Sequence, residues 1–207
     1  QSYLDRGGVT LFFDMINAFN NCSRRRAYDQ MRLKLPTLLP LFALLYGAPS
    51  QALIAKGISL GTIRSGVKQG CPLAMIAFCL TIHPLLEALQ KHTEDCTIAF
   101  LEEPIQGEDY DDFIGEPKVL GYADDTRVNI DWRLFFKTPM LIMEPANYYS
   151  LENPSPWLRG CLELIDAHGF VNHPDKMMAL SKVIHMGFNN RIAQKDNGLM
   201  DLGVPIG

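Results

Sequence analysis

Two adjacent aspartates, Asp124 and Asp125, lie between two apolar runs, at 119–123 and 126–130. Neighbouring side chains of a continuous strand point to opposite faces of a sheet, so one long strand would direct one of these carboxylates into the interior. Burying an unpaired carboxylate is costly, whereas both acids can reach solvent at the tip of a hairpin. The segment therefore predicts two strands that meet at Asp124 and Asp125. A solvated turn is the simple interpretation of such a pair, and a bound divalent cation, which would offset the repulsion, is the alternative.

Asp14 ends a second segment of the same kind. Residues 9–14 (VTLFFD) are too apolar to alternate and predict a short buried strand with an acid at its end. Magnesium usually takes one or two protein carboxylates and shares its other positions with water and substrate phosphates. Two such ions, about 3.5–4 Å apart, can activate an attacking hydroxyl and stabilise the leaving oxygen. Asp14, Asp124 and Asp125 would supply the acids of such a centre; taken alone, Asp14 is equally well explained as a strand-end cap.

Residues 65–73 (SGVKQGCPL) form a third notable segment, in which Gly66 and Gly70 precede a helix opened by Pro72. A flexible loop at the start of a helix can approach a phosphate or a base pair closely. An ordinary strand-to-helix connection is the simpler interpretation.

The remaining elements follow from periodicity, caps and breakers. A helix is predicted from Arg24 to about Leu35, with Ser23 as its N-cap, and a second over 38–45. A long helix is predicted from Pro72 to about Lys91, with a kink at Pro84, and a fourth helix over 157–168. A hairpin is predicted over 52–64, and strands over 97–101, 177–180, 183–188 and 202–207. Residues 138–156 have no period and predict a surface loop or insertion. Strands and helices mix without strict alternation, which predicts an α+β fold.

Composition limits the choice of function. With 47% hydrophobic residues, the 207-residue chain can bury one core, and its net charge of −4 argues against a uniformly basic nucleic-acid binder. The acids are concentrated, however: residues 94–125 hold eleven acids and one base, so the remainder is mildly basic and could accept a polyanion with a cation to mediate. Five scattered cysteines indicate a reducing compartment. No signal peptide is visible, and Thr81, His83 and Pro84 interrupt the longest apolar run, which favours a buried helix over a membrane span.

Five segments, in order along the chain, together resemble the palm domain of reverse transcriptases. They are 12–19 (FFDMINAF), 66–73 (GVKQGCPL), 122–125 (YADD), 169–176 (GFVNHPDK) and 202–207 (LGVPIG). The forms of the first two resemble the non-LTR retrotransposon branch. The resemblance implies an antiparallel, ferredoxin-like sheet backed by helices, with part of the fingers within about 36–65. It also leads us to expect one partial domain over 1–207 that lacks the thumb and most of the fingers.

The resemblance also implies roles for individual residues. Asp14, Asp124 and Asp125 would hold two Mg²⁺ ions, or Mn²⁺ in their place, with the main-chain carbonyl of Met15 as a further ligand. Phe19 would exclude a ribose 2′-hydroxyl. Lys68, Gln69 and Gly70 would contact the nucleotide and the template. Leu202 and Gly203 would hold the primer, and Lys176 would donate a proton to the departing pyrophosphate. For Lys176 a solvated lysine is the alternative, and for Arg24, Arg25 and Arg26 a solvated helix face is preferred to a phosphate contact.

The implied function is RNA-directed DNA synthesis by a retroelement enzyme, with an RNA template, a DNA primer and deoxynucleotides as partners and no membrane. The location would be intracellular, and nuclear for an active element. The fragment alone is expected to be inactive without the fingers and thumb of its parent polyprotein. One alternative is a degenerate, non-catalytic copy that acts at most as a nucleic-acid scaffold. An Asp-dependent phosphohydrolase is another, but it would leave residues 66–73 unexplained.

Overall fold

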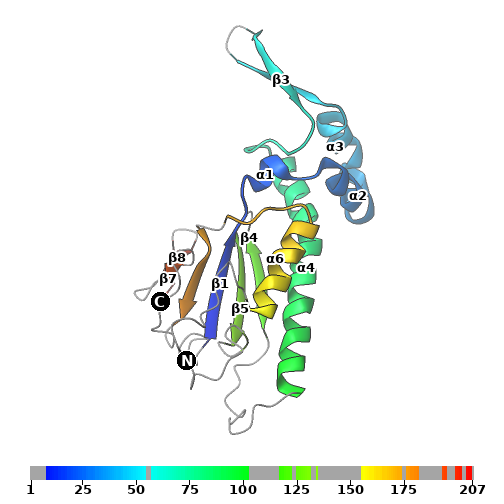
Figure 1. Cartoon of the computed structure of the whole chain (residues 1–207). Coiled ribbons are helices and arrows are strands. Elements are labelled where there is room, and N and C mark those ends of the chain that lie inside the picture. Colours follow the sequence, from blue (N-terminus) through cyan, green and yellow to red (C-terminus); the bar gives the residue numbers. More distant parts are fainter. Residues whose placement is uncertain are drawn as a thin grey trace.

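The computed structural model of the chain describes residues 8–54, 57–102, 117–122, 125–131, 134, 155–173, 176–181, 193–194, 199–201 and 204–206. Within them lies a mixed α+β fold, as the sequence predicts (Figure 1). A five-stranded sheet forms one layer, two helices cover it, and a smaller helical region with a hairpin extends from one end.

The main sheet has the order β4-β5-β1-β6-β7. Its strands are β1 (Gly8–Asp14), β4 (Lys118–Tyr122), β5 (Asp125–Asp131), β6 (Met178–Ser181) and β7 (Ala193–Gln194). The central strand β1 pairs antiparallel with β5 on one side and with β6 on the other. Only the short β7 departs from the antiparallel arrangement that was expected, because it runs parallel to β6. The apolar run of β1 is buried as predicted, and only Asp14 at its end is partly exposed.

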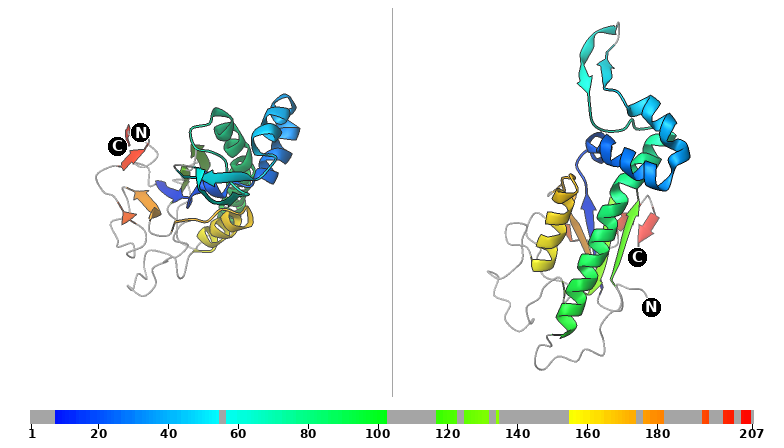
Figure 2. Two further views of the ribbon diagram at one scale, coloured as in Figure 1. Left: turned by 90° about the horizontal axis from the view of Figure 1, so that it is seen from above. Right: turned by 90° about the vertical axis from the view of Figure 1, so that its right-hand side faces the viewer.

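Helices α4 (Pro72–Glu102) and α6 (Pro156–Ala167) lie side by side on one face of the sheet (Figure 2). Their close approach depends on Gly160, where a Cβ atom would come within 2.3 Å of the His92 ring. Trp157 closes the same contact: its indole nitrogen donates to the hydroxyl of Thr93 at 3.1 Å, and its carbonyl oxygen lies 3.0 Å from His92 Nε2. The sheet is therefore covered by a closely packed helix pair.

Helix α4 corrects two predictions. It continues well beyond Lys91, and the strand predicted over 97–101 is its last turns. The β-branched Thr93 and Thr97 fit the helix because their hydroxyls donate to the carbonyls of Leu89 and Thr93, both at 2.7 Å. Pro84 lies inside the helix. By length and composition alone α4 could cross a membrane, but a core helix passes the same test, and eleven α4 residues, including Phe78 and Leu89, are buried.

The second region follows β1. It holds α1 (Ala18–Asn21), α2 (Arg24–Lys34), a 3-10 turn η2 (Pro36–Leu38), α3 (Leu39–Tyr46) and the hairpin of β2 (Ser50–Leu53) with β3 (Ser59–Ile63). The Ser23 hydroxyl accepts from the Arg26 amide, which confirms the predicted cap of α2. Figure 2 shows the hairpin projecting away from the sheet.

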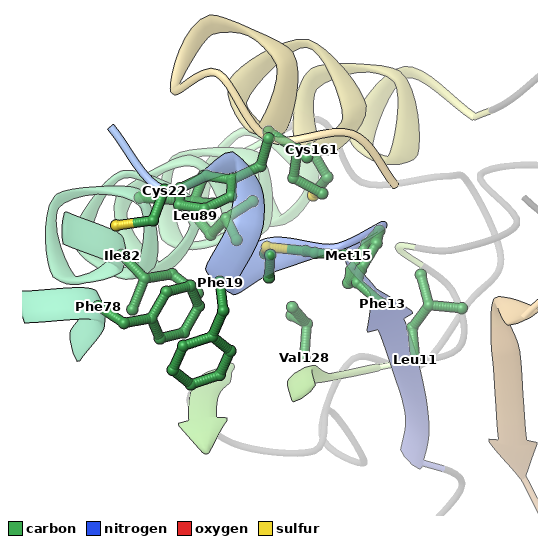
Figure 3. Packing of buried hydrophobic residues seen from close by; sticks show 14 of the residues in the cluster. Leu11, Phe13, Met15, Phe19, Cys22, Phe78, Ile82, Leu89, Val128 and Cys161 are labelled. Carbon is green, nitrogen blue, oxygen red and sulfur yellow. The ribbon is translucent and has the colours of Figure 1, made fainter. Parts of the chain in front are cut away.

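The core joins both regions. Leu11 and Phe13 on β1, Met15 just after it and Val128 on β5 belong to the core beneath the helices, while Phe19 and Cys22 pack against α4 (Figure 3). Alternation along β1 therefore places Asp14 on the opposite face of the sheet from this core.

The chain's last described element is a hairpin of β8 (Leu199–Asp201) with β9 (Val204–Ile206), and β9 lies within the closing segment 202–207 predicted as a strand. The predicted strand over 183–188 and almost all of the 138–156 loop lie outside the described residues.

Candidate nucleotidyl-transfer site

Asp14 and Asp125 come together although most of the chain separates them. In the antiparallel register of β1 and β5, Asp14 lies directly opposite Asp125. Directly opposed residues project from the same face of a sheet, with Cβ atoms about 4.5–5.5 Å apart. Two carboxylates so close repel each other unless a cation lies near. The register thus places these two acids opposite each other, as the sequence predicts, while a shared pair of ions stays a prediction.

The adjacent Asp124 lies outside the described residues, as do Leu202 and Gly203. Asp125 itself is the first residue of β5 and pairs with Tyr122 at the end of β4, so two strands do meet at the acidic pair. Among the described residues there is no cluster of three or more His, Cys, Asp or Glu side chains suited to a metal ion.

Lys176 supplies a cation beside Asp14. Its Nζ lies 3.1 Å from Asp14 Oδ2, and both side chains are partly exposed. The turn before Lys176 also holds the backbone of Asp14, because the His173 amide donates to the Asp14 carbonyl at 2.7 Å. Met15, next in the chain, is buried and pairs with Asn172 in an isolated bridge. The 169–176 segment therefore positions the end of β1 through the His173 backbone amide and the Lys176 side chain.

Two polar atoms of this turn are buried without a hydrogen-bond partner among the described residues: Asn172 Oδ1 and His173 Nδ1. Buried polar atoms are nearly always paired, to protein or to water. Both belong to residues bonded to the Asp14–Met15 backbone. Both residues lie within the 169–176 segment that was singled out in the sequence, but only Lys176 of that segment was given a role.

Residues 66–71, called the glycine loop below, divide into an anchored half and an exposed half. Gly66 and Val67 are buried, and their amides donate to the carbonyls of Cys22 and Phe19, both at 2.9 Å. Lys68, Gln69 and Gly70 are exposed. Since Phe19 belongs to α1, which follows Asp14 closely, the loop is tied to the segment that leaves the candidate site.

Phe19 is 9% exposed, and its ring stacks on that of Phe78 with centroids 4.5 Å apart (Figure 3). It is therefore at least a core residue. Its role in excluding a ribose 2′-hydroxyl stays a prediction. Because so little of the side chain is exposed, only an edge of it could contact a nucleotide.

Two of the three arginines at the start of α2 depart from the preferred interpretation of a solvated face. Arg24 Nε donates to the Gly66 carbonyl at 2.8 Å, while Arg26 donates through both terminal nitrogens to the Ala167 and His168 carbonyls at the end of α6. Arg25 alone is exposed without a hydrogen bond to the part of the chain that the structure describes. The alternation of bonded and solvated arginines was not visible in the sequence, because their acceptors are distant backbone carbonyls.

Cys71 and Tyr46 form a polar contact at the end of the glycine loop. The Tyr46 hydroxyl, followed by the Ala74 amide, lowers the pKa of the Cys71 thiol below its usual value. Burial raises the pKa of Tyr46, so its hydroxyl stays protonated and can donate to sulfur.

Comparison with protein-family models finds no matching family, and comparison with curated proteins finds no significant match. The site is therefore interpreted from its own residues.

Proposed function

We propose that this chain is the palm of an RNA-directed DNA polymerase that transfers deoxynucleotides to a primer 3′-hydroxyl. The observation that carries the proposal is the register that sets Asp14 opposite Asp125 at the end of two central strands. It is supported by the 169–176 turn, which fixes Asp14, and by the glycine loop, which is anchored to the segment after Asp14.

The described donors fit magnesium. Two carboxylates on one face match the one or two that Mg²⁺ usually takes, which leaves its other positions to water and phosphate oxygens. Asp124, the chain neighbour of Asp125, would complete the set. Bound there, the ions would activate the hydroxyl and neutralise the developing phosphate charge.

The chain's own residues would supply position and charge. Asp14 and Asp125 would present oxygen ligands, and Lys176, whose Nζ lies 3.1 Å from Asp14 Oδ2, would donate a proton to a leaving phosphate oxygen. An exposed ion pair is worth at most about 1 kcal/mol, so Lys176 can leave Asp14 at little cost. The exposed half of the glycine loop would contact the nucleotide and the template.

The test is primer extension on an RNA template by the complete protein whose reading frame contains this chain. Extension that needs Mg²⁺ or Mn²⁺ and is abolished in Asp14→Asn and Asp124→Asn is expected. Asp29→Asn is the matched control, since Asp29 is an exposed carboxylate on α2. Template binding without extension, equal in wild type and Asp14→Asn, would refute the polymerase and favour the non-catalytic scaffold.

A further inference from the structure

The side chain of Arg24 joins three separate segments. Its Nε donates to Gly66 O at 2.8 Å, its Nη1 donates to Ala48 O at 3.2 Å, and its guanidinium carbon lies 5.5 Å from the ring centroid of Tyr46. Ala48 precedes β2 and Gly66 follows β3, so one side chain on α2 binds both ends of the projecting hairpin. An isolated two-stranded hairpin is marginal in water, so its base needs such a support.

Tyr46 extends the same contact to the exposed half of the glycine loop. It is the last residue of α3, is 4% exposed, and packs its ring against Phe42 at 5.1 Å between centroids. Its hydroxyl accepts the backbone amide of Lys68 at 3.3 Å. The Tyr46 ring is therefore held by Phe42, and its hydroxyl contacts the glycine loop at Lys68, where the exposed half of the loop begins.

We infer that Arg24 is a positioning residue which, together with Tyr46, holds the glycine loop so that Lys68, Gln69 and Gly70 face the substrate. The Gly66 and Val67 amides anchor the loop to Cys22, which caps α1, and to Phe19 in α1, but they leave the Gly66 carbonyl and the Lys68 amide to the Arg24–Tyr46 pair. The inference rests on the proposed function for what the loop contacts. That Arg24 fixes the loop does not depend on the proposed function.

The geometry requires arginine. Its planar guanidinium presents two donors to two carbonyls while its face lies over an aromatic ring, and a lysine ammonium cannot do both. Bonds from a charged donor are stronger than neutral ones, so their loss should loosen the loop measurably. Because a misplaced binding loop weakens substrate binding, the change should appear in KM for the nucleotide more than in kcat.

The experiment compares Arg24→Lys and Tyr46→Phe with Arg25→Lys. The control makes the same chemical change one residue away, at a side chain that is exposed and makes no hydrogen bond to the described residues. Amide hydrogen exchange of residues 66–69 is measured in the 207-residue chain, with its thermal unfolding recorded alongside. Nucleotide KM and kcat are measured in the complete protein.

We expect Arg24→Lys to speed exchange in the loop and to raise the nucleotide KM, each about tenfold, the change that follows from losing one charge-assisted hydrogen bond. Tyr46→Phe should speed exchange at Lys68 in particular, and Arg25→Lys should match wild type. Loop exchange equal in Arg24→Lys and Arg25→Lys would overturn the inference, as would faster exchange with an unchanged KM. If the wild-type protein extends no primer, the proposed function fails, and the exchange comparison alone decides whether Arg24 fixes the loop.

Discussion

Gly66 and Gly70 offer a paired test of how the glycine loop is built. Both have left-handed backbone conformations, with φ of +75° and +82°. Alanine in that conformation costs about 1–2 kcal/mol, and the loss of freedom in the unfolded chain returns about 0.4–1 kcal/mol. Both terms apply equally at the two sites, so they cancel when the two variants are compared.

The surroundings of the two glycines differ. A Cβ atom on Gly66 would lie 2.4 Å from the Asn20 carbonyl oxygen and 2.8 Å from its carbonyl carbon, whereas a Cβ atom on Gly70 meets nothing within 4 Å. The clash is with backbone, so α1 or the loop must move. Overpacking of this kind costs about 1–3 kcal/mol. Gly66→Ala should therefore lower the free energy of unfolding by about 1–3 kcal/mol more than Gly70→Ala.

Urea unfolding of the 207-residue chain, followed by circular dichroism, measures this difference. The comparison is valid where wild type and both variants share one m-value, because the same surface is then exposed in each. Equal destabilisation by the two substitutions would refute the packing of the loop on α1. A larger effect at Gly70 would refute it as well.

Three further outcomes are expected. In the 207-residue chain, Asp14→Asn should weaken Mn²⁺ binding, measured by electron paramagnetic resonance, at least tenfold, since it removes a charged ligand; unchanged binding would contradict the metal site. The lowered pKa of Cys71 means that its alkylation by iodoacetamide should rise at lower pH than that of free cysteine, and Tyr46→Phe should move the rise back to higher pH. An identical pH profile in the variant would exclude the Tyr46 contact. In the complete protein, Phe19→Val should reduce discrimination against ribonucleotides about tenfold to a hundredfold, whereas an equal fall in both rates would leave Phe19 a core residue only.

Local signals in the sequence were sufficient for most elements. The strand at 9–14, the Ser23 cap, the hairpin near 52–64 and the start of α4 at Pro72 all depend on residues within a few positions of one another. Such signals act through propensity, capping and backbone restriction, and these do not require knowledge of the fold.

The end of α4 shows where local signals mislead. Thr97 and Ile98 have side chains that favour strands, yet they continue a helix. Threonine hydroxyls bond back to carbonyls one turn earlier, and the packing of Thr93 against Trp157 of α6 rewards the helical form. This gain depends on a residue 64 positions further along the chain, and local propensity takes no account of such distant contacts.

The candidate site was predictable as a set of acids but not as a geometry. Nothing local to Asp14 indicates that Asp125 lies opposite it or that Lys176 reaches its carboxylate from 162 residues away. Arg24 was similarly assigned to a solvated face. Its partners are backbone carbonyls, and because every residue has a carbonyl, the sequence cannot indicate which ones Arg24 binds.

The Asp14–Lys176 pair also shows how the site separates stability from function. The fold is held by the buried face of β1, where Leu11 and Phe13 are 0% and 1% exposed, and not by the partly exposed ion pair on the other face. Surface pairs contribute at most about 1 kcal/mol, against about 2–5 kcal/mol for truncating a buried leucine. If a cation or a phosphate binds there as proposed, the charges around Asp14 would therefore rearrange without loss of the fold. The hydrogen bond from the His173 amide to the Asp14 main-chain carbonyl, which does not depend on side-chain charge, would keep the backbone of Asp14 in place during that exchange.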